Sequence, residues 1–196
     1  PRLYSLQGFR YCDLLLAQAG ADVQGIGEVL ERAKYAWETS RAQLSLLSQA
    51  LDQLTLARTH LQLAIHPSTS GRRAEGVHIT QAADWLEQAV AGLRAAGQDD
   101  DLPRGLLTRA TLHRLTHNFP QAQQDLQEVH DIAEPSGMRL HLTDYHLEAA
   151  RLAHAMGEPQ ETVQHHLQAA ADLIQQTGYH RRDEELAELQ KKLGDH

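Results

Sequence analysis

Residues 133–146 read AEPSGMRLHLTDYH, and they join the end of one helix-forming run to the start of the next. A Pro-Ser-Gly break that ends at Gly137 separates the two runs, and similar breaks surround Gly97 and Gly178. The three glycines lie 40 and 41 residues apart along the chain. A fixed period of about 20–50 residues is typical of a repeat array. The spacing therefore predicts a helix-turn-helix unit that occurs several times.

The composition favours helices. The chain has 196 residues, of which 41% are hydrophobic and 5% aromatic, and Leu, Ala, Gln, Glu and Arg are abundant. These residues have high helix propensity, so the composition predicts an all-α protein. Cys12 is the only cysteine, which excludes an intramolecular disulfide and suits the cytoplasm. Because the chain begins at Pro1 and not at Met, we expect it to be a fragment of a longer protein.

Apolar residues recur at helical spacing along most of the chain and predict nine or ten helices. The predicted helices cover about residues 3–19, 24–39, 42–65, 77–96, 103–117, 120–134, 138–156, 159–176 and 180–193. They group into units at about 1–40, 41–97, 98–137 and 138–178, with a cap in 179–196, all within one domain over 1–196. Residues 66–76, HPSTSGRRAEG, lack apolar periodicity, which predicts an inserted loop in the second unit.

One small residue marks the middle of the first helix in each unit: Gly8, Ala57, Ala110 and Ala150. A side chain of so little bulk lets the partner helix approach closely. These four positions therefore set the register in which the units are compared.

In this register the sequence resembles the tetratricopeptide repeat family. HNFPQA, residues 117–122, is similar to that family's turn of Gly, Asp or Asn, an aromatic residue, two variable residues and Ala, with His117 in place of the Gly. MGEPQET, residues 156–162, matches the turn at Gly157 and Glu158, and GFRY, residues 8–11, matches two first-helix positions. The family repeat has about 34 residues, whereas the units here have about 40.

The resemblance implies a right-handed solenoid of about four helix-turn-helix units and a C-terminal capping helix. In such a fold the first helices line a concave groove that binds a peptide or protein segment. The whole chain also resembles the C-terminal helical-repeat region of large bacterial multidomain proteins, some of which have NTPase modules upstream.

Arginines and leucines alternate at the positions that the register places in this groove. These positions are Leu54, Arg58, Arg104, Leu107, Thr111, Arg114, Leu147, Arg151 and His154. Arginine recognises carboxylates in a planar, bidentate manner, which favours an acidic and apolar partner segment. In the alternative interpretation, each arginine pairs with a carboxylate of the scaffold.

Thirteen histidines raise the alternative of a metal site, because His113 and His117 are spaced i, i+4. No HExxH motif supplies the remaining ligands, so we predict structural histidines, no metal and no cofactor. The chain has no GxSxG motif and no Gly-rich phosphate loop, which argues against an enzyme. Its net charge of −8 argues against binding to nucleic acid, and no apolar run reaches the roughly 18 residues of a membrane span.

The sequence therefore predicts a protein-protein interaction module. One alternative is a regulatory or scaffolding arm that packs on other domains of a multidomain signalling or NTPase protein. Another is a metal-dependent enzyme that uses a histidine-rich face. The partner is expected to be a protein or peptide, and the oligomeric state stays open.

Overall fold

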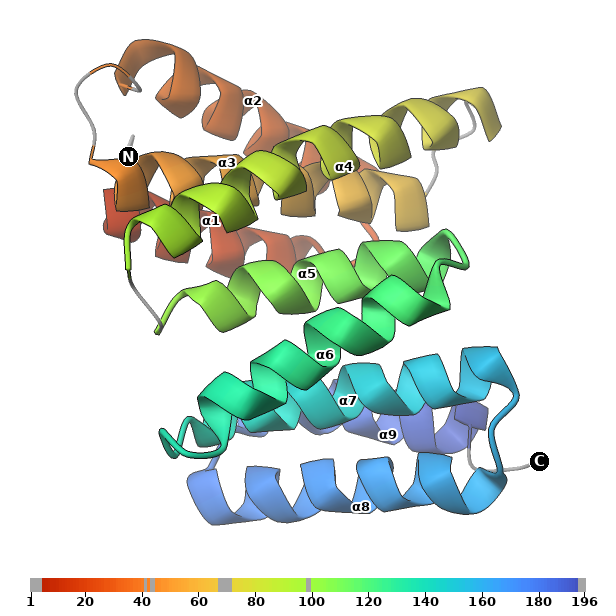
Figure 1. Cartoon of the computed structure of the whole chain (residues 1–196). Helices are drawn as coiled ribbons and strands as arrows, with labels where there is room; N and C mark the ends of the chain where they lie inside the picture. Colours follow the sequence, from red (N-terminus) through yellow and green to blue (C-terminus); the bar gives the residue numbers. More distant parts are fainter. Residues whose placement is uncertain (1–4, 41, 43–44, 67–71, 98–99, 194–196) are drawn as a thin grey trace. The chain divides into compact units, whose positions relative to one another are not determined.

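The computed structural model describes residues 5–40, 42, 45–66, 72–97 and 100–193, and these residues form helices and no strand (Figure 1). The α-helices are α1 (Ser5–Ala19), α2 (Val23–Ser40), α3 (Leu46–Ile65), α4 (Arg72–Ala95), α5 (Leu102–Leu115), α6 (Phe119–Ala133), α7 (Arg139–Met156), α8 (Gln160–Thr177) and α9 (Asp183–Leu193). A 3₁₀ helix, η2 (His180–Arg182), precedes α9. The prediction of an all-α protein is confirmed.

The chain divides into two compact units, Pro1–Gly105 and Leu106–His196. Helices that follow each other in the sequence pack together within each unit, as expected for repeated helix pairs. The described helices lack the combination of length and apolarity that a membrane span needs.

Helix α3 is the central element of the first unit. It packs against α1, α2 and α4, and it is buried on almost all sides, polar side chains such as Asp52, Thr59 and His60 included. The Ser45 hydroxyl begins the helix by accepting a hydrogen bond of 3.3 Å from the Ser48 amide. A large cluster of the core joins α1, α2 and α3 through Cys12, Leu16, Ile26, Val29, Leu30, Ala33, Leu56 and Leu63.

Helices α3 and α4 approach each other closely at Gly92. A Cβ atom added to Gly92 would lie 2.9 Å from the Cβ atom of Ala50, which cannot move without its backbone. We expect Gly92→Ala to lower the free energy of unfolding by about 1–3 kcal/mol, although alanine favours helix over glycine. Urea unfolding followed by tryptophan fluorescence measures this, since Trp37 and Trp85 both lie in the first unit.

The matched control for Gly92→Ala is Gly76→Ala in the same helix. A Cβ atom at Gly76 would meet nothing within 4 Å. This variant is expected to gain about 0.5–1 kcal/mol of stability from helix propensity alone. A similar gain in Gly92→Ala would contradict the close approach of α3 and α4.

Helix α7 is the central element of the second unit, where it packs against α6 and α8. One side of α7 joins α5 and α6 in a cluster that contains Ala110, Ala122, Leu126, Ala149 and Leu152. The other side joins α8 and α9 in a cluster that contains Leu147, Ala150, Ala153, Val163, Leu167, Ala170, Ile174, Leu186, Leu189 and Leu193. Both clusters use α7, so its side chains decide how this unit holds together.

The predicted register and most helix ends agree with the structure. Ala57, Ala110 and Ala150 are at most 1% exposed. Gly97, Gly137 and Gly178 follow helix ends with φ angles of 63°, 65° and 69°, the left-handed region in which glycine is favoured.

The predicted loop at 66–76 is wrong in its second half. Residues 72–76 form the first turn of α4, while 67–71 lie outside the described residues. Arg, Ala and Glu favour helix, and Glu75 suits the positive end of the helix dipole. Apolar periodicity does not reveal this turn, because exposed positions such as Glu75 and Gly76 need no apolar side chain.

Candidate interaction surface

The first unit contains three of the predicted groove positions. In the first unit, Leu54 is fully buried and therefore belongs to the core. Arg58 forms an ion pair with Asp13, and its side chain is 26% exposed. Arg104 lies 3.3 Å from Asp101 in an i, i+3 ion pair, and its side chain is 37% exposed. Its guanidinium lies 5.8 Å from the centre of the Phe9 ring. Of the two arginines, Arg104 has the more exposed side chain.

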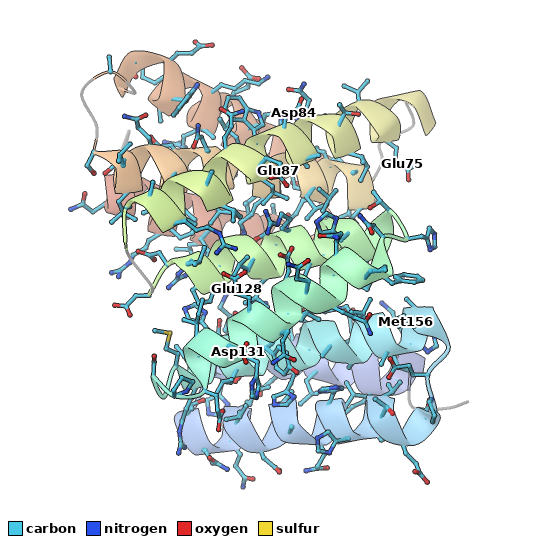
Figure 2. All side chains as sticks on the ribbon, viewed as in Figure 1. Glu75, Asp84, Glu87, Glu128, Asp131 and Met156 are labelled. Carbon is cyan, nitrogen blue, oxygen red and sulfur yellow. The ribbon has the colours of Figure 1, made fainter. Side chains whose placement is uncertain are left out.

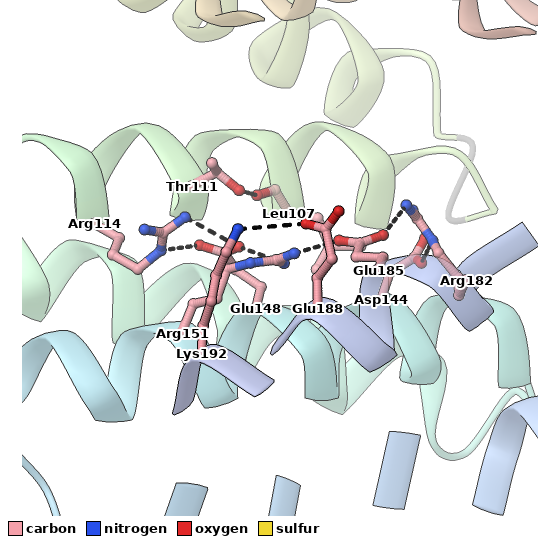
Figure 3. A network of polar contacts seen from close by, with 10 residues as sticks. All are labelled: Leu107, Thr111, Arg114, Asp144, Glu148, Arg151, Arg182, Glu185, Glu188 and Lys192. Atoms are coloured by element: carbon pink, nitrogen blue, oxygen red, sulfur yellow. Dashed lines mark hydrogen bonds and ion pairs between the residues drawn. The ribbon is translucent and has the colours of Figure 1, made fainter. Parts of the chain in front are cut away.

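In the second unit, α5 supplies Leu107, Thr111 and Arg114. Leu107 packs against the cluster between α5, α6 and α7, and the Thr111 hydroxyl donates to the Leu107 carbonyl at 3.1 Å. The Arg114 Nε donates to Glu148 on α7 at 2.6 Å (Figure 3). This last contact fixes α5 to α7.

Helix α7 supplies Leu147, Arg151 and His154. Leu147 is 1% exposed and lies in the core, whereas His154 is exposed. Arg151 contacts Glu148 at 3.4 Å and also forms an ion pair with Glu185 of α9. Among the predicted groove positions, Leu54 and Leu147 are therefore buried in the core, and the four arginines pair with carboxylates of the scaffold.

The buried carboxylate of Glu148 joins two of these arginines. Glu148 is 5% exposed and accepts hydrogen bonds from both Arg114 and Arg151. Burial of an unpaired carboxylate is very unfavourable, so the two arginines offset the cost of burying the Glu148 side chain. The alternative in which arginines tie the scaffold holds for Arg114 and Arg151, and it does not exclude a further contact with a partner.

The ion pairs continue along the α9 side of α7. Arg182 donates to Asp144 at 2.7 Å and to Glu185 at 2.6 Å. Burial disfavours the Arg182 cation, but Asp144 and Glu185 outweigh this and raise its pKa. Burial likewise disfavours the Glu185 carboxylate, but Arg182 and Arg151 outweigh this and lower its pKa.

The neighbouring arginines at residues 181 and 182 lie in different surroundings. Arg181 is exposed, but the Arg182 side chain is only 24% exposed and joins η2 to α7. Sequence separation hides this contact, since Asp144 lies 38 residues before Arg182. Their separation is close to the repeat period of about 40 residues, which is the one signal that could have suggested the pair.

Two histidine pairs were also missed. His60 on α3 and His78 on α4 place their Nδ1 atoms 3.0 Å apart. His146 on α7 and His166 on α8 do the same at 2.9 Å. Each pair crosses between the two helices of a hairpin. The contact requires one Nδ1 atom to donate a hydrogen bond and the other to accept it. Only one ring of each pair therefore carries a proton on Nδ1.

The spacing of His113 and His117 misled the search for ligands. Helix α5 ends at Leu115, and His117 lies in the following turn with a φ of 58°, so the two side chains do not share a helical face. This left-handed conformation agrees with the alignment of His117 to the glycine of the tetratricopeptide turn. His113 lies 3.8 Å from Asp125. Within the described ranges, no group of three or more His, Cys, Asp or Glu side chains could hold a metal ion.

Cys12 is buried, and burial raises the pKa of its thiol to about 11. A thiol of this kind is a poor nucleophile at neutral pH, because the thiolate is the reactive form.

Comparison by sequence adds no assignment: no protein-family model and no curated protein matches the chain. The resemblance to tetratricopeptide repeats therefore stays a prediction from the motifs.

Proposed function

We propose that the chain is a protein-protein interaction module whose arginine-bearing first-helix surface binds acidic and apolar segments. Its helix pairs would belong to a right-handed solenoid of tetratricopeptide type. The observation that carries this proposal is the way in which the second unit holds its own helix α9.

Helix α9 has the chemistry that the groove was predicted to recognise. Its sequence, DEELAELQKKL, places Asp and Glu in the first turn and leucines along one side. Leu186, Leu189 and Leu193 are buried against α7 and α8, and Glu185 pairs with Arg151. An acidic, amphipathic helix is thus a segment that fits a first helix bearing arginine and leucine.

Arg104 is the residue best suited to test the proposal. Its side chain is 37% exposed, whereas that of Arg114 is 16% exposed, so its replacement disturbs the scaffold less than replacement of Arg114 would. Peptides selected from a displayed random library against the full chain are expected to combine Asp or Glu with Leu. Arg104→Glu should weaken the best of them at least tenfold in fluorescence anisotropy, about 1.4 kcal/mol.

The matched control is Arg94→Glu, which makes the same change of charge on the exposed last turn of α4. It should bind the selected peptides as the unchanged protein does. Tryptophan fluorescence during urea unfolding checks that both variants keep the first unit folded. Equal binding by Arg104→Glu and Arg94→Glu, or selection of peptides without acidic residues, would count against the proposal.

A scaffolding arm within a multidomain protein is the second candidate. The ion pairs around Glu148 and Glu185 favour this candidate, because arginines held in place by scaffold carboxylates form a rigid surface on which another domain can pack. It differs in placing the acidic segment in another domain of the same chain. A full-length gene product that contains such a segment and fails to select free peptides would favour this candidate.

A further inference from the structure

Charge is segregated between the helices of the second unit. The second helices of its pairs, α6 and α8, contain no Lys or Arg in their described sequences, and their acidic residues are Asp125, Glu128, Asp131, Glu161 and Asp172. Asp125 is buried beside Arg109, from which it accepts two hydrogen bonds, whereas Asp131, Glu161 and Asp172 are exposed. The arginines lie on α5, α7 and η2. The exposed charged side chains that α6 and α8 themselves supply are therefore acidic, and Arg139 of α7 adds one cation, which donates to Gln176 of α8 at 2.9 Å.

A surface cavity of about 210 Å³ lies on this acidic side, between α6, α7 and α8. Its lining combines apolar side chains, among them Leu126, Tyr145, Leu152 and Met156, with the polar side chains of Gln123, Gln127, Glu158 and His166. These α7 residues belong to the side of the helix that faces α6, whereas Arg151 pairs with α9 on another side. The cavity is thus separate from the arginine-bearing surface.

Aromatic contacts hold the Tyr145 wall of the cavity in place. The Tyr145 ring centre lies 5.3 Å from that of His130, 4.9 Å from His146 and 6.0 Å from His166. The hydrogen bond of 2.9 Å between His146 and His166 fixes two of these three imidazoles to each other. A wall formed before binding lowers the entropy that a partner must lose.

Carboxylates stand at the edge of the cavity. Glu158 lines it directly. Gln127 also lines it and donates a hydrogen bond of 2.8 Å to Asp131, which holds the Asp131 carboxylate beside the opening. Figure 2 shows Glu128 and Asp131 on α6 and Met156 at the end of α7. A depression with a partly apolar lining and carboxylates at its edge is complementary to a large side chain with positive neighbours.

We propose that the α6–α8 surface binds a basic amphipathic segment of a partner protein, with one large apolar side chain in the cavity and flanking Lys or Arg beside Asp131 and Glu158. A cavity of about 150 Å³ holds a benzene ring, so 210 Å³ accepts one aromatic or aliphatic side chain. It is smaller than the roughly 300–1,000 Å³ of drug-sized ligand sites, which favours an anchor side chain over a metabolite. This surface is additional to the one that binds acidic segments and has the opposite charge preference.

The test is a selection of random displayed peptides against the full chain at low salt. Among the binders we expect a class with Leu, Phe or Trp flanked by Lys or Arg. In fluorescence anisotropy, a labelled peptide of this class should bind at least tenfold more weakly to the Asp131→Lys/Glu158→Lys variant. Raising the salt concentration should also weaken it, because the flanking contacts are exposed.

The control is Glu184→Lys/Glu188→Lys, which changes the net charge by the same amount at two exposed positions of α9, away from the α6–α8 surface. This variant should retain binding to within about twofold. Ala149→Met, which fills the cavity from α7, should weaken the basic peptide and leave the acidic peptides of the Arg104 experiment unaffected. Circular dichroism checks that each variant is folded.

Three results would overturn the inference: no basic and apolar class among the selected peptides, equal loss in the two charge variants, or equal binding by acidic and basic peptides to the same surface. None of these depends on whether Arg104 binds acidic segments, so the two proposals fail or succeed separately.

Discussion

Replacing Arg114 with methionine is expected to lower the free energy of unfolding by about 3–5 kcal/mol, because it removes one cation from a buried carboxylate. Glu148 is 5% exposed, and the Arg114 Nε lies 2.6 Å from its Oε1 atom. After the change, the nearest remaining cation is Arg151 at 3.4 Å, which Glu185 also engages. Methionine keeps most of the apolar contacts of the arginine side chain. The decrease in the free energy of unfolding therefore measures the effect of removing the positive charge.

A double variant separates the ion pair from the packing. Arg114→Met together with Glu148→Leu removes both partners, and apolar replacement of a buried pair is often nearly neutral. We therefore expect the double variant to recover most of the stability in urea unfolding followed by far-ultraviolet circular dichroism. If Arg114→Met alone cost less than about 1 kcal/mol, Glu148 would not depend on this arginine.

The control for Arg114→Met is Lys192→Met in α9. Lys192 lies 3.4 Å from Glu188, but both side chains are about 70% exposed, at 69% and 71% (Figure 3). Exposed pairs contribute little, so a change below about 0.5 kcal/mol is expected. The comparison tests burial as the cause, since both variants remove one cation from one ion pair.

Local chemistry explains why so much of the helical pattern could be predicted. Gly97, Gly137 and Gly178 end helices because the chain needs a left-handed residue there, and a residue type suited to that conformation can be recognised in the sequence. Ala110 and Ala150 could be recognised as close-packing positions because small residues 40 residues apart match the spacing of the glycines. These signals lie within a few residues of the structure that they predict.

The chemistry of the surface could not be predicted in the same way. Arg114 and Glu148 lie 34 residues apart, and only the packing of α5 on α7 shows that they meet. His60 and His78 meet across 18 residues for the same reason. His113 and His117 show the reverse error: a helical spacing placed them together, and the end of α5 separates them.

Acid is expected to destabilise the first unit through the His60 and His78 pair. Burial, then the neighbouring His78 and Lys34, lowers the pKa of His60 from 6.5 to about 4. Burial and Lys34 also lower the pKa of His78. Above pH 6.5 both histidines are neutral in the folded and the unfolded chain, and the full stability is present.

Below pH 6.5 the unfolded chain binds protons that the folded His60 does not bind, so stability falls as the pH falls and levels off near pH 4. With His60 only 6% exposed, the loss is about 2–3 kcal/mol over this range. Asp52 acts in the opposite sense, because burial raises the pKa of its carboxyl group to about 6. The contribution of the histidines must therefore be measured as a difference between variants.

Urea unfolding at a series of pH values, followed by the fluorescence of Trp37 and Trp85, gives this difference. These two rings lie edge to face at 5.6 Å within the first unit, so their signal reports on it. His60→Leu/His78→Leu should remove most of the loss below pH 6.5, since neither leucine can take up a proton. His66→Gln, at the end of α3, should keep it. An unchanged pH dependence in the double variant would show that other groups cause the acid sensitivity. It would also show that packing of His60 and His78 between α3 and α4 does not disfavour their protonation in the folded chain.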